Sequence, residues 1–97
     1  MPYVADGGEP FWSLEIAEGR LIYSRDEEPI SVALPPRRET ANGYRYETPR
    51  ITVDIKHEEC ADDGNTIRAD SVTVTVGEET VQGCGGEVLE TLFSDDG

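Results

Sequence analysis

The single histidine and the first of two cysteines lie three residues apart, at His57 and Cys60. A thiol beside an imidazole is the arrangement of an activated cysteine nucleophile. Glu58 and Glu59 separate the two, however, and negative charge beside a thiol disfavours the reactive thiolate. No glycine-rich phosphate loop, nucleophile elbow or triad spacing accompanies the pair. The sequence therefore predicts no catalytic residue and no enzyme.

Oxygen-bearing side chains gather in the segment that follows. They are Asp62, Asp63, Asn65 and Asp70, with Glu58 and Glu59 nearby. Hard oxygen ligands on a glycine-containing loop suit Ca²⁺. Their spacing does not match the EF-hand register, and an ordinary solvated turn with Asx hydrogen bonds explains the same residues. We predict no metal site and no cofactor, and keep a small calcium-binding domain as an alternative.

Two aromatic segments are the candidates for binding. Phe11 precedes the sole tryptophan, Trp12, and successive side chains of a strand point to opposite faces, so one of the two rings should face the surface. A buried tryptophan in a strand is commonly part of the core. Tyr44 and Tyr46 follow Asn42-Gly43 and either fill the core or form a recognition patch. The predicted binding residues are Phe11, Trp12, Asn42, Gly43, Tyr44 and Tyr46.

Alternation of apolar and polar residues marks the strands that must position these side chains. The clearest runs are 11–16, 51–56 and 71–76, and shorter ones cover 21–24, 30–34, 44–46 and 80–84. Residues 88–93 fit either a final strand or one helical turn. Turn residues separate the runs, including the Asn42-Gly43 signal of a tight hairpin.

Seven or eight short strands without a long helical pattern predict an all-β protein. A small antiparallel β-barrel is favoured, closed because few residues must hide all strand edges. We expect residues 9–93 to form one domain, with a flexible N-terminal tail over 1–8 and a flexible C-terminal tail over 94–97.

Cys60 and Cys84 predict a disulfide. A domain of this size buries only some 60–65% of its unfolded surface and is marginally stable without a staple. Closing a loop of about 25 residues stabilises it by ~3–4 kcal/mol in the chain-entropy model. Two unpaired structural thiols are the alternative. Two cysteines in a short, acidic all-β chain favour an oxidising compartment over the cytosol.

The charge is strongly negative and unevenly distributed. The chain holds 21 acids and 8 bases, and residues 51–97 contain twelve of these acids against Lys56 and Arg68 alone. Such a surface repels nucleic acids and anionic membranes, and it steers cationic partners towards itself. Simple solvation of a small protein explains the same composition. No apolar run approaches the roughly 20 residues of a transmembrane helix, so this segment is not expected to insert into a membrane.

The opening Gly8-Glu9-Pro10-Phe11-Trp12-Ser13-Leu14-Glu15-Ile16 resembles the G-x-E-P-F-W-x-x-x-I opening of a family of small bacterial envelope domains, many of them predicted lipoproteins or secreted proteins. Cys60-Ala61-Asp62-Asp63-Gly64, the strand from Val72 to Val76 and Gly83-Cys84-Gly85 resemble the later part of that family. The resemblance spans about residues 8–86. It implies an exported protein, with a signal or lipid anchor upstream, and a small antiparallel barrel similar to META-type domains and membrane-bound inhibitors of C-type lysozyme.

Together these features predict a non-enzymatic binding module of the bacterial envelope, periplasmic or secreted, that recognises a protein or a cell-wall component. A cationic protein is the expected kind of partner, because the charge is negative. The second hypothesis is an inhibitor of a cationic lysozyme-type hydrolase, which would insert the segment from Ala41 to Tyr46 into the cleft of the enzyme.

Overall fold

The computed structural model describes residues 2–8, 11–25, 29–62 and 65–91, which form β-strands and no helix. The strands are β1 (Tyr3–Gly8), β2 (Phe11–Ala17), β3 (Arg20–Arg25), β4 (Ile30–Ala33), β5 (Arg38–Thr40), β6 (Gly43–Glu47), β7 (Thr52–Lys56), β8 (Cys60–Ala61), β9 (Thr66–Val76) and β10 (Glu79–Thr91). Within these ranges no helix long and apolar enough to cross a bilayer is found. The all-β prediction is confirmed.

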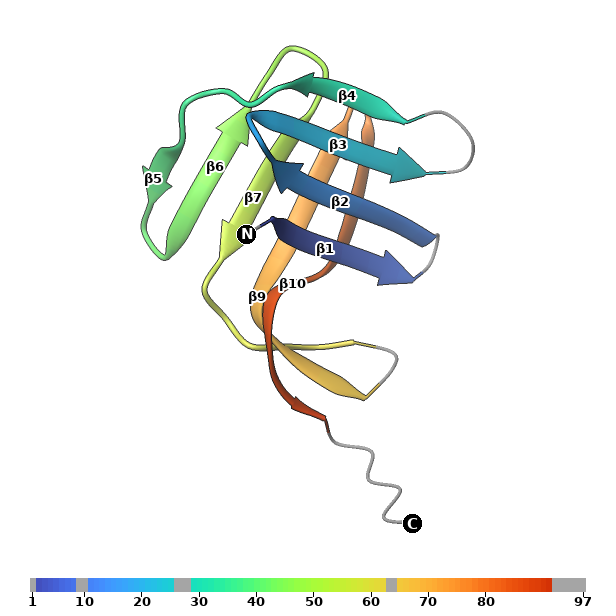
Figure 1. The fold of residues 1–97 in the computed structure, drawn as a ribbon, viewed down its shortest axis with the longest axis vertical. Helices are drawn as coiled ribbons and strands as arrows, with labels where there is room; N and C mark the ends of the chain where they lie inside the picture. Colours follow the sequence, from blue (N-terminus) through green and yellow to red (C-terminus); the bar gives the residue numbers. More distant parts are fainter. Residues whose placement is uncertain (1, 9–10, 26–28, 63–64, 92–97) are drawn as a thin grey trace.

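All strands belong to one antiparallel sheet, in the order β4-β3-β2-β1-β10-β9-β7-β6-β5, and β8 adds to β9. Figure 1 shows how the sheet curls, so that β1 to β3 lie across β7, β9 and β10. The predicted barrel takes the form of a half-barrel, because the order ends at β4 and β5 and no ladder joins these two strands in the described part of the chain. Ten strands replace the expected seven or eight, since β1, β5 and β8 carry too few apolar residues to be recognised.

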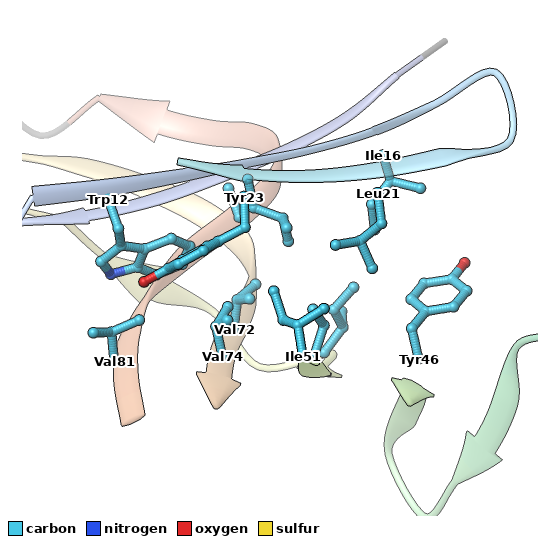
Figure 2. Packing of buried hydrophobic residues seen from close by; sticks show 13 residues of the cluster. Trp12, Ile16, Leu21, Tyr23, Tyr46, Ile51, Val72, Val74 and Val81 are labelled. Carbon is cyan, nitrogen blue, oxygen red and sulfur yellow. The ribbon is translucent and has the colours of Figure 1, made fainter. Parts of the chain in front are cut away.

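The core lies between the two halves of the curled sheet, as Figure 2 shows. Its buried members come from both halves: Ala5, Trp12, Leu14, Ile16, Leu21, Tyr23, Tyr46, Ile51, Val53, Ile55, Val72, Val74 and Val81. The alternation predicted over 11–16, 51–56 and 71–76 is confirmed, because one set of side chains in each run is buried. Fully burying a large apolar side chain contributes about 1.5–3 kcal/mol, so this one layer supplies most of the stabilisation.

The N-terminal segment differs from its prediction. Residues 3–8 are strand β1, which pairs with β2 along its whole length and with β10 at two positions, so the expected flexible tail is wrong for these residues. Only Ala5 of this strand is fully buried, and Gly7 has no side chain to show a pattern. Residues 88–91 continue strand β10. The predicted tail over 94–97, together with Leu92 and Phe93, lies outside the described residues, as do Glu9 and Pro10.

The predicted disulfide is confirmed. Cys60 on β8 is bonded to Cys84 on β10, with their Cα atoms 5.4 Å apart and a separation of 24 residues. The bond joins the two-residue strand β8, which pairs with β9, to strand β10 of the main sheet.

Trp12 lies where the two halves meet and depends on two glycines. A Cβ on Gly7 would lie 2.3 Å from the indole Nε1, and a Cβ on Gly83 would lie 2.8 Å from Cζ2. The indole also packs against the Tyr23 ring, with 6.0 Å between the ring centroids and 37° between the ring planes. Trp12 is fully buried, and its Nε1 has no hydrogen-bond partner in the described structure. Close packing of the ring between the strands therefore fixes its position.

Gly83→Ala should lower the free energy of unfolding by about 3 kcal/mol. The added Cβ would lie 2.1 Å from the Asp6 carbonyl oxygen as well as against Trp12, and backbone must move to relieve this overlap. Urea denaturation followed by the fluorescence of the sole tryptophan measures the loss. Gly19→Ala is the matched control, because its surroundings are open and only its positive φ of 79° opposes alanine, at about 1 kcal/mol. Equal losses in the two variants would contradict the tight approach of β10 to β1 and Trp12.

Candidate functional site

The first pair of predicted binding residues is divided between core and surface. Trp12 is fully buried, and the structure does not offer it to a ligand. Phe11 points the other way and is 69% exposed. The expected alternation of the two rings is thus observed, and Phe11 is the member of the pair that a partner can contact.

The second predicted group lies at the hairpin between β5 and β6. Asn42 is exposed in the turn, whereas Gly43 and Tyr46 are buried and Tyr44 is half-buried. The turn is tied to the end of β7, because the His57 backbone N–H donates to the Asn42 carbonyl oxygen at 2.8 Å. These four residues are close together, and Asn42 is the exposed one, although its side-chain amide donates to the His57 carbonyl oxygen at 3.4 Å.

Tyr44 is the centre of an aromatic cluster at this end of the half-barrel. Its ring meets Tyr46 edge-on at 5.6 Å and His57 at 5.7 Å between centroids. The Arg37 guanidinium lies over the ring at 4.6 Å, a cation–π contact. Burial, followed by the nearby Tyr46 and Asp70, raises the pKa of Tyr44 above its ordinary value.

Asp70 joins this cluster to the N-terminal strand. Its carboxylate accepts a hydrogen bond from Tyr3 Oη at 2.8 Å, and His57 Nδ1 lies 2.9 Å from its other oxygen. Asp70 is only 7% exposed, so both contacts compensate the cost of burying a charge. Burial and the hydrogen bond to Asp70 raise the pKa of Tyr3 far above its ordinary value of 10.0.

The arrangement orients His57 but does not complete a catalytic set. A carboxylate accepts hydrogen bonds, so Asp70 holds the proton of His57 on Nδ1 and turns Nε2 away. The Cys60 sulfur is bonded to Cys84 and cannot act as a nucleophile for this histidine. The thiol–imidazole pair considered from the sequence is therefore replaced by a Tyr3–Asp70–His57 hydrogen-bond chain.

A second feature lies on the outer face of the sheet, beside the disulfide. Ile55 and Val72 point into the core, so their neighbours Lys56 and Ser71 point outward. There they border a hollow of ≈ 440 Å³ between β1, β10 and the loop after β7. Its charged lining consists of Asp6, Glu58, Asp62 and Lys56.

Arg68 contacts two of the acids that line this hollow and is 8% exposed. Its guanidinium approaches Asp6 Oδ2 at 3.7 Å and Asp62 Oδ2 at 3.9 Å, and it donates to the Val4 carbonyl oxygen at 3.0 Å. A buried guanidinium needs such partners, and Arg68 thereby joins the loop after β8 to strand β1.

The calcium alternative needs the loop acids to converge, and the described ones have other partners. Asp70 is engaged by Tyr3 and His57, whereas Asp62 accepts a hydrogen bond from the Thr66 backbone N–H at 3.1 Å. Asp63 lies outside the described residues. Among the residues that are described, no three His, Cys, Asp or Glu side chains are placed to hold one metal ion.

Sequence reasoning missed Tyr3, Arg37 and Arg68 as parts of these two sites, and it assigned Asp70 to a loop. One signal for Asp70 was available: it stands two residues before Val72 and four before Val74, on the same inward face of a strand. Nothing in the sequence indicated Tyr3 as its partner, because the two are 67 residues apart.

Comparisons of this chain with protein-family models, with curated proteins and with solved structures gave no match.

The raised pKa values of Tyr3 and Tyr44 predict a loss of stability at alkaline pH. Each folded-state pKa lies above the ordinary value, so the contribution is complete below pH 10.0 and declines as pH rises through the interval towards the folded-state value. Unfolding free energies measured by urea on both sides of that pH should fall with increasing pH, and tyrosinate absorbance should reveal tyrosines that ionise only on unfolding.

Tyr3→Phe should lower stability by about 1.5 kcal/mol at neutral pH, because Asp70 loses a hydrogen bond to its charged oxygen. The same variant should show a shallower alkaline decline, since one shifted group is gone. An identical slope in the variant and the original chain would contradict the role of Tyr3.

Proposed function

We propose that this chain is a non-enzymatic binding domain of the bacterial cell envelope and that its partner is a cationic protein. The observation that carries the proposal is the charge of the surface beside the disulfide. Residues 57–91 contain nine acids and one arginine, Arg68, which is buried. The exposed charges of this part of the described structure are therefore acidic, apart from any charge on His57.

The opposite edge of the sheet has a different charge. Residues 35–55 contain four bases and three acids, and their outer face carries ion pairs between Arg45 and Asp54 at 2.7 Å and between Arg38 and Glu47 at 3.2 Å. Charge there is largely neutralised within the chain. At the hollow, Arg68 is buried and approaches Asp6 and Asp62, whereas Glu58 and the neighbouring Glu59 are exposed and supply a negative field that attracts a cationic surface.

The disulfide supports the proposed compartment. Cys60 is only partly buried, and a bond that closes 24 residues of chain persists where thiols are oxidised rather than in the reducing cytosol. Because the bond anchors β8 beside the hollow, reduction would loosen the acidic surface itself. A domain that depends on this bond suits the periplasm or the cell exterior.

Binding to a cationic protein should depend on the acids near the disulfide. With C-type lysozyme as the cationic probe at low salt, Glu58→Gln/Glu59→Gln should weaken binding about fivefold, measured by calorimetry over a salt series. Both side chains are exposed, and neither has an ion pair among the described residues. Glu18→Gln/Glu78→Gln removes the same charge from two distant turns and should change the affinity by less than about twofold. Absence of salt-sensitive binding, or equal effects of the two variants, would contradict the proposal.

A lysozyme-type hydrolase is a second candidate, as the target of inhibition. The observation that favours it is the rigid hairpin: Tyr44 and Tyr46 are held in the aromatic cluster, which leaves Ala41 and Asn42 exposed at its tip. A preformed turn can enter a cleft at a low cost in conformational entropy.

Inhibition requires more than binding, and muramidase activity separates the two. An excess of this domain should abolish the activity of C-type lysozyme in low salt. The Asn42→Trp variant of the domain, whose hairpin tip is larger, should keep its fold but should no longer inhibit the enzyme. Full muramidase activity in the presence of bound domain would remove the inhibitor candidate and leave the binding domain in place.

A further inference from the structure

Strand β10 continues well beyond its partner β1. The β1–β10 ladder consists of Ala5 with Gly85 and Asp6 with Cys84, whereas β10 runs on to Thr91. Over this extension β10 pairs on one side with residues 66–68 of β9. On its other side no strand of the described structure pairs with residues 87–91. Figure 1 shows this part of β10 projecting from the curled sheet.

The separation of β1 from β10 is built into the structure. Gly86, which follows the last residue of the β1–β10 ladder, has a φ of 82°, which favours glycine. The ladder of β10 to β9 shifts its register between Gly85 and Val88 and again between Val88 and Glu90. Arg68 donates to the carbonyl oxygens of Val4 and Gly86, at 3.0 and 3.3 Å. The arginine thereby satisfies backbone acceptors at the point where the β1–β10 ladder ends. The free edge of β10 begins directly after this point.

The exposed edge is apolar and acidic at once. Val88 and Leu89 are 55% and 46% exposed, and Val4 on the adjacent end of β1 is 44% exposed. Glu87 and Glu90 flank the two apolar residues, and both are exposed. Val88 pairs with Arg68 and Glu90 with Ile67, which are consecutive residues of β9, so Val88 and Glu90 lie on opposite faces of the sheet. An extended segment that alternates basic and apolar residues presents one kind of side chain to each of these faces, and its backbone can pair with the unpaired edge.

A second copy of this chain fits the edge poorly. Antiparallel self-pairing centred between Val88 and Leu89 would place Glu87 opposite Glu90 twice, and like charges directly opposite each other are destabilising. Each chain also carries a net charge of −13. The glutamates thus protect the edge from aggregation while leaving it open to a basic strand.

We propose that residues 87–91 of β10 bind an extended basic segment of the partner as an added antiparallel strand. This inference rests on the proposed function and names the place and the mode of contact. The backbone of the added strand pairs with the free edge, its apolar side chains cover Val88 and Leu89, and its basic side chains meet Glu87 and Glu90.

The test uses a short blocked peptide in which lysine and valine alternate, added to the intact chain at low salt. Amide hydrogen exchange of residues 87–91, followed by NMR, should slow when the peptide binds, because their backbone groups enter a ladder. The same peptide with alternate amide nitrogens methylated keeps its charge but cannot donate those hydrogen bonds, and it should bind at least about tenfold more weakly.

Two charge-reversal variants locate the contact. Glu87→Lys/Glu90→Lys should lower the affinity for the alternating peptide at least about tenfold. Glu18→Lys/Glu78→Lys, which makes the same change in net charge, should lower this affinity by less than about threefold. Val88→Ser/Leu89→Ser should also lower the affinity for the peptide, without any change in charge. Circular dichroism of each variant checks that the sheet is retained.

Equal binding of the methylated peptide, or equal effects of the two charge reversals, would overturn strand addition while the binding of a cationic protein stands. Failure of both the peptide and C-type lysozyme to bind at low salt would overturn both proposals. Slowed exchange at residues 87–91 that depends on protein concentration alone would mean that the edge pairs with a second copy, which also overturns the inference.

Discussion

The junction between β1 and β10 is the constraint on which the rest of the structure depends. In the hydrogen-bonding order, β4, β3 and β2 are connected to the other half of the sheet through β1, and the β1–β10 ladder has two residue pairs. So short a ladder cannot by itself hold two halves together. Side chains that cross the junction supply the remainder: the Trp12 ring packs against Gly7 and Gly83, and Tyr3 bonds to Asp70. Arg25, the cross-strand neighbour of Trp12 on β3, forms an ion pair with Glu79 at the start of β10.

Two buried charges on β9, two residues apart, contact the strands at this junction. Asp70 receives Tyr3 and His57, and Arg68 reaches the start of β1 and the loop after β8. A buried charge is costly unless it is paired and hydrogen-bonded. Each of these two side chains therefore holds its partners from other strands in place. The use of Arg68 inside the structure also has an electrostatic consequence. Arg68, the one arginine of residues 57–91, is buried beside Asp6 and Asp62, so the exposed Glu58 and Glu59 keep the surface near the disulfide acidic.

The same junction explains why the molecule has a free edge. A curled sheet of a small chain can hide most of its strands, but β10 is longer than β1 and extends past it. The disulfide and the short strand β8 support β9 in this extension, and they leave the far side of β10 without a partner in the described residues. Charged side chains guard this edge, which is how soluble β-proteins keep exposed strands from pairing indiscriminately.

Much of the fold was determined by the sequence alone. The period-two patterns around Trp12, Ile55 and Val74 specify which faces are buried, because a strand places alternate side chains on opposite sides. The two cysteines and the charge imbalance are likewise local facts that need no coordinates. Strand β1 was not predicted, because it is stabilised by pairing with two neighbouring strands and has hardly any apolar side chain that would reveal it.

Only the tertiary structure decided which residues act together. Tyr3 and Asp70, or Arg68 and Val4, are separated by more than sixty residues, and their contacts arise from the curl of the sheet and from the position at which β1 leaves β10. The tertiary structure also removed Trp12 and Tyr46 from the accessible surface and exposed the edge of β10. Residue types and spacing predict the face of a strand on which a side chain lies. The partner that it meets there is set by long-range register, which depends on the packing of the whole sheet.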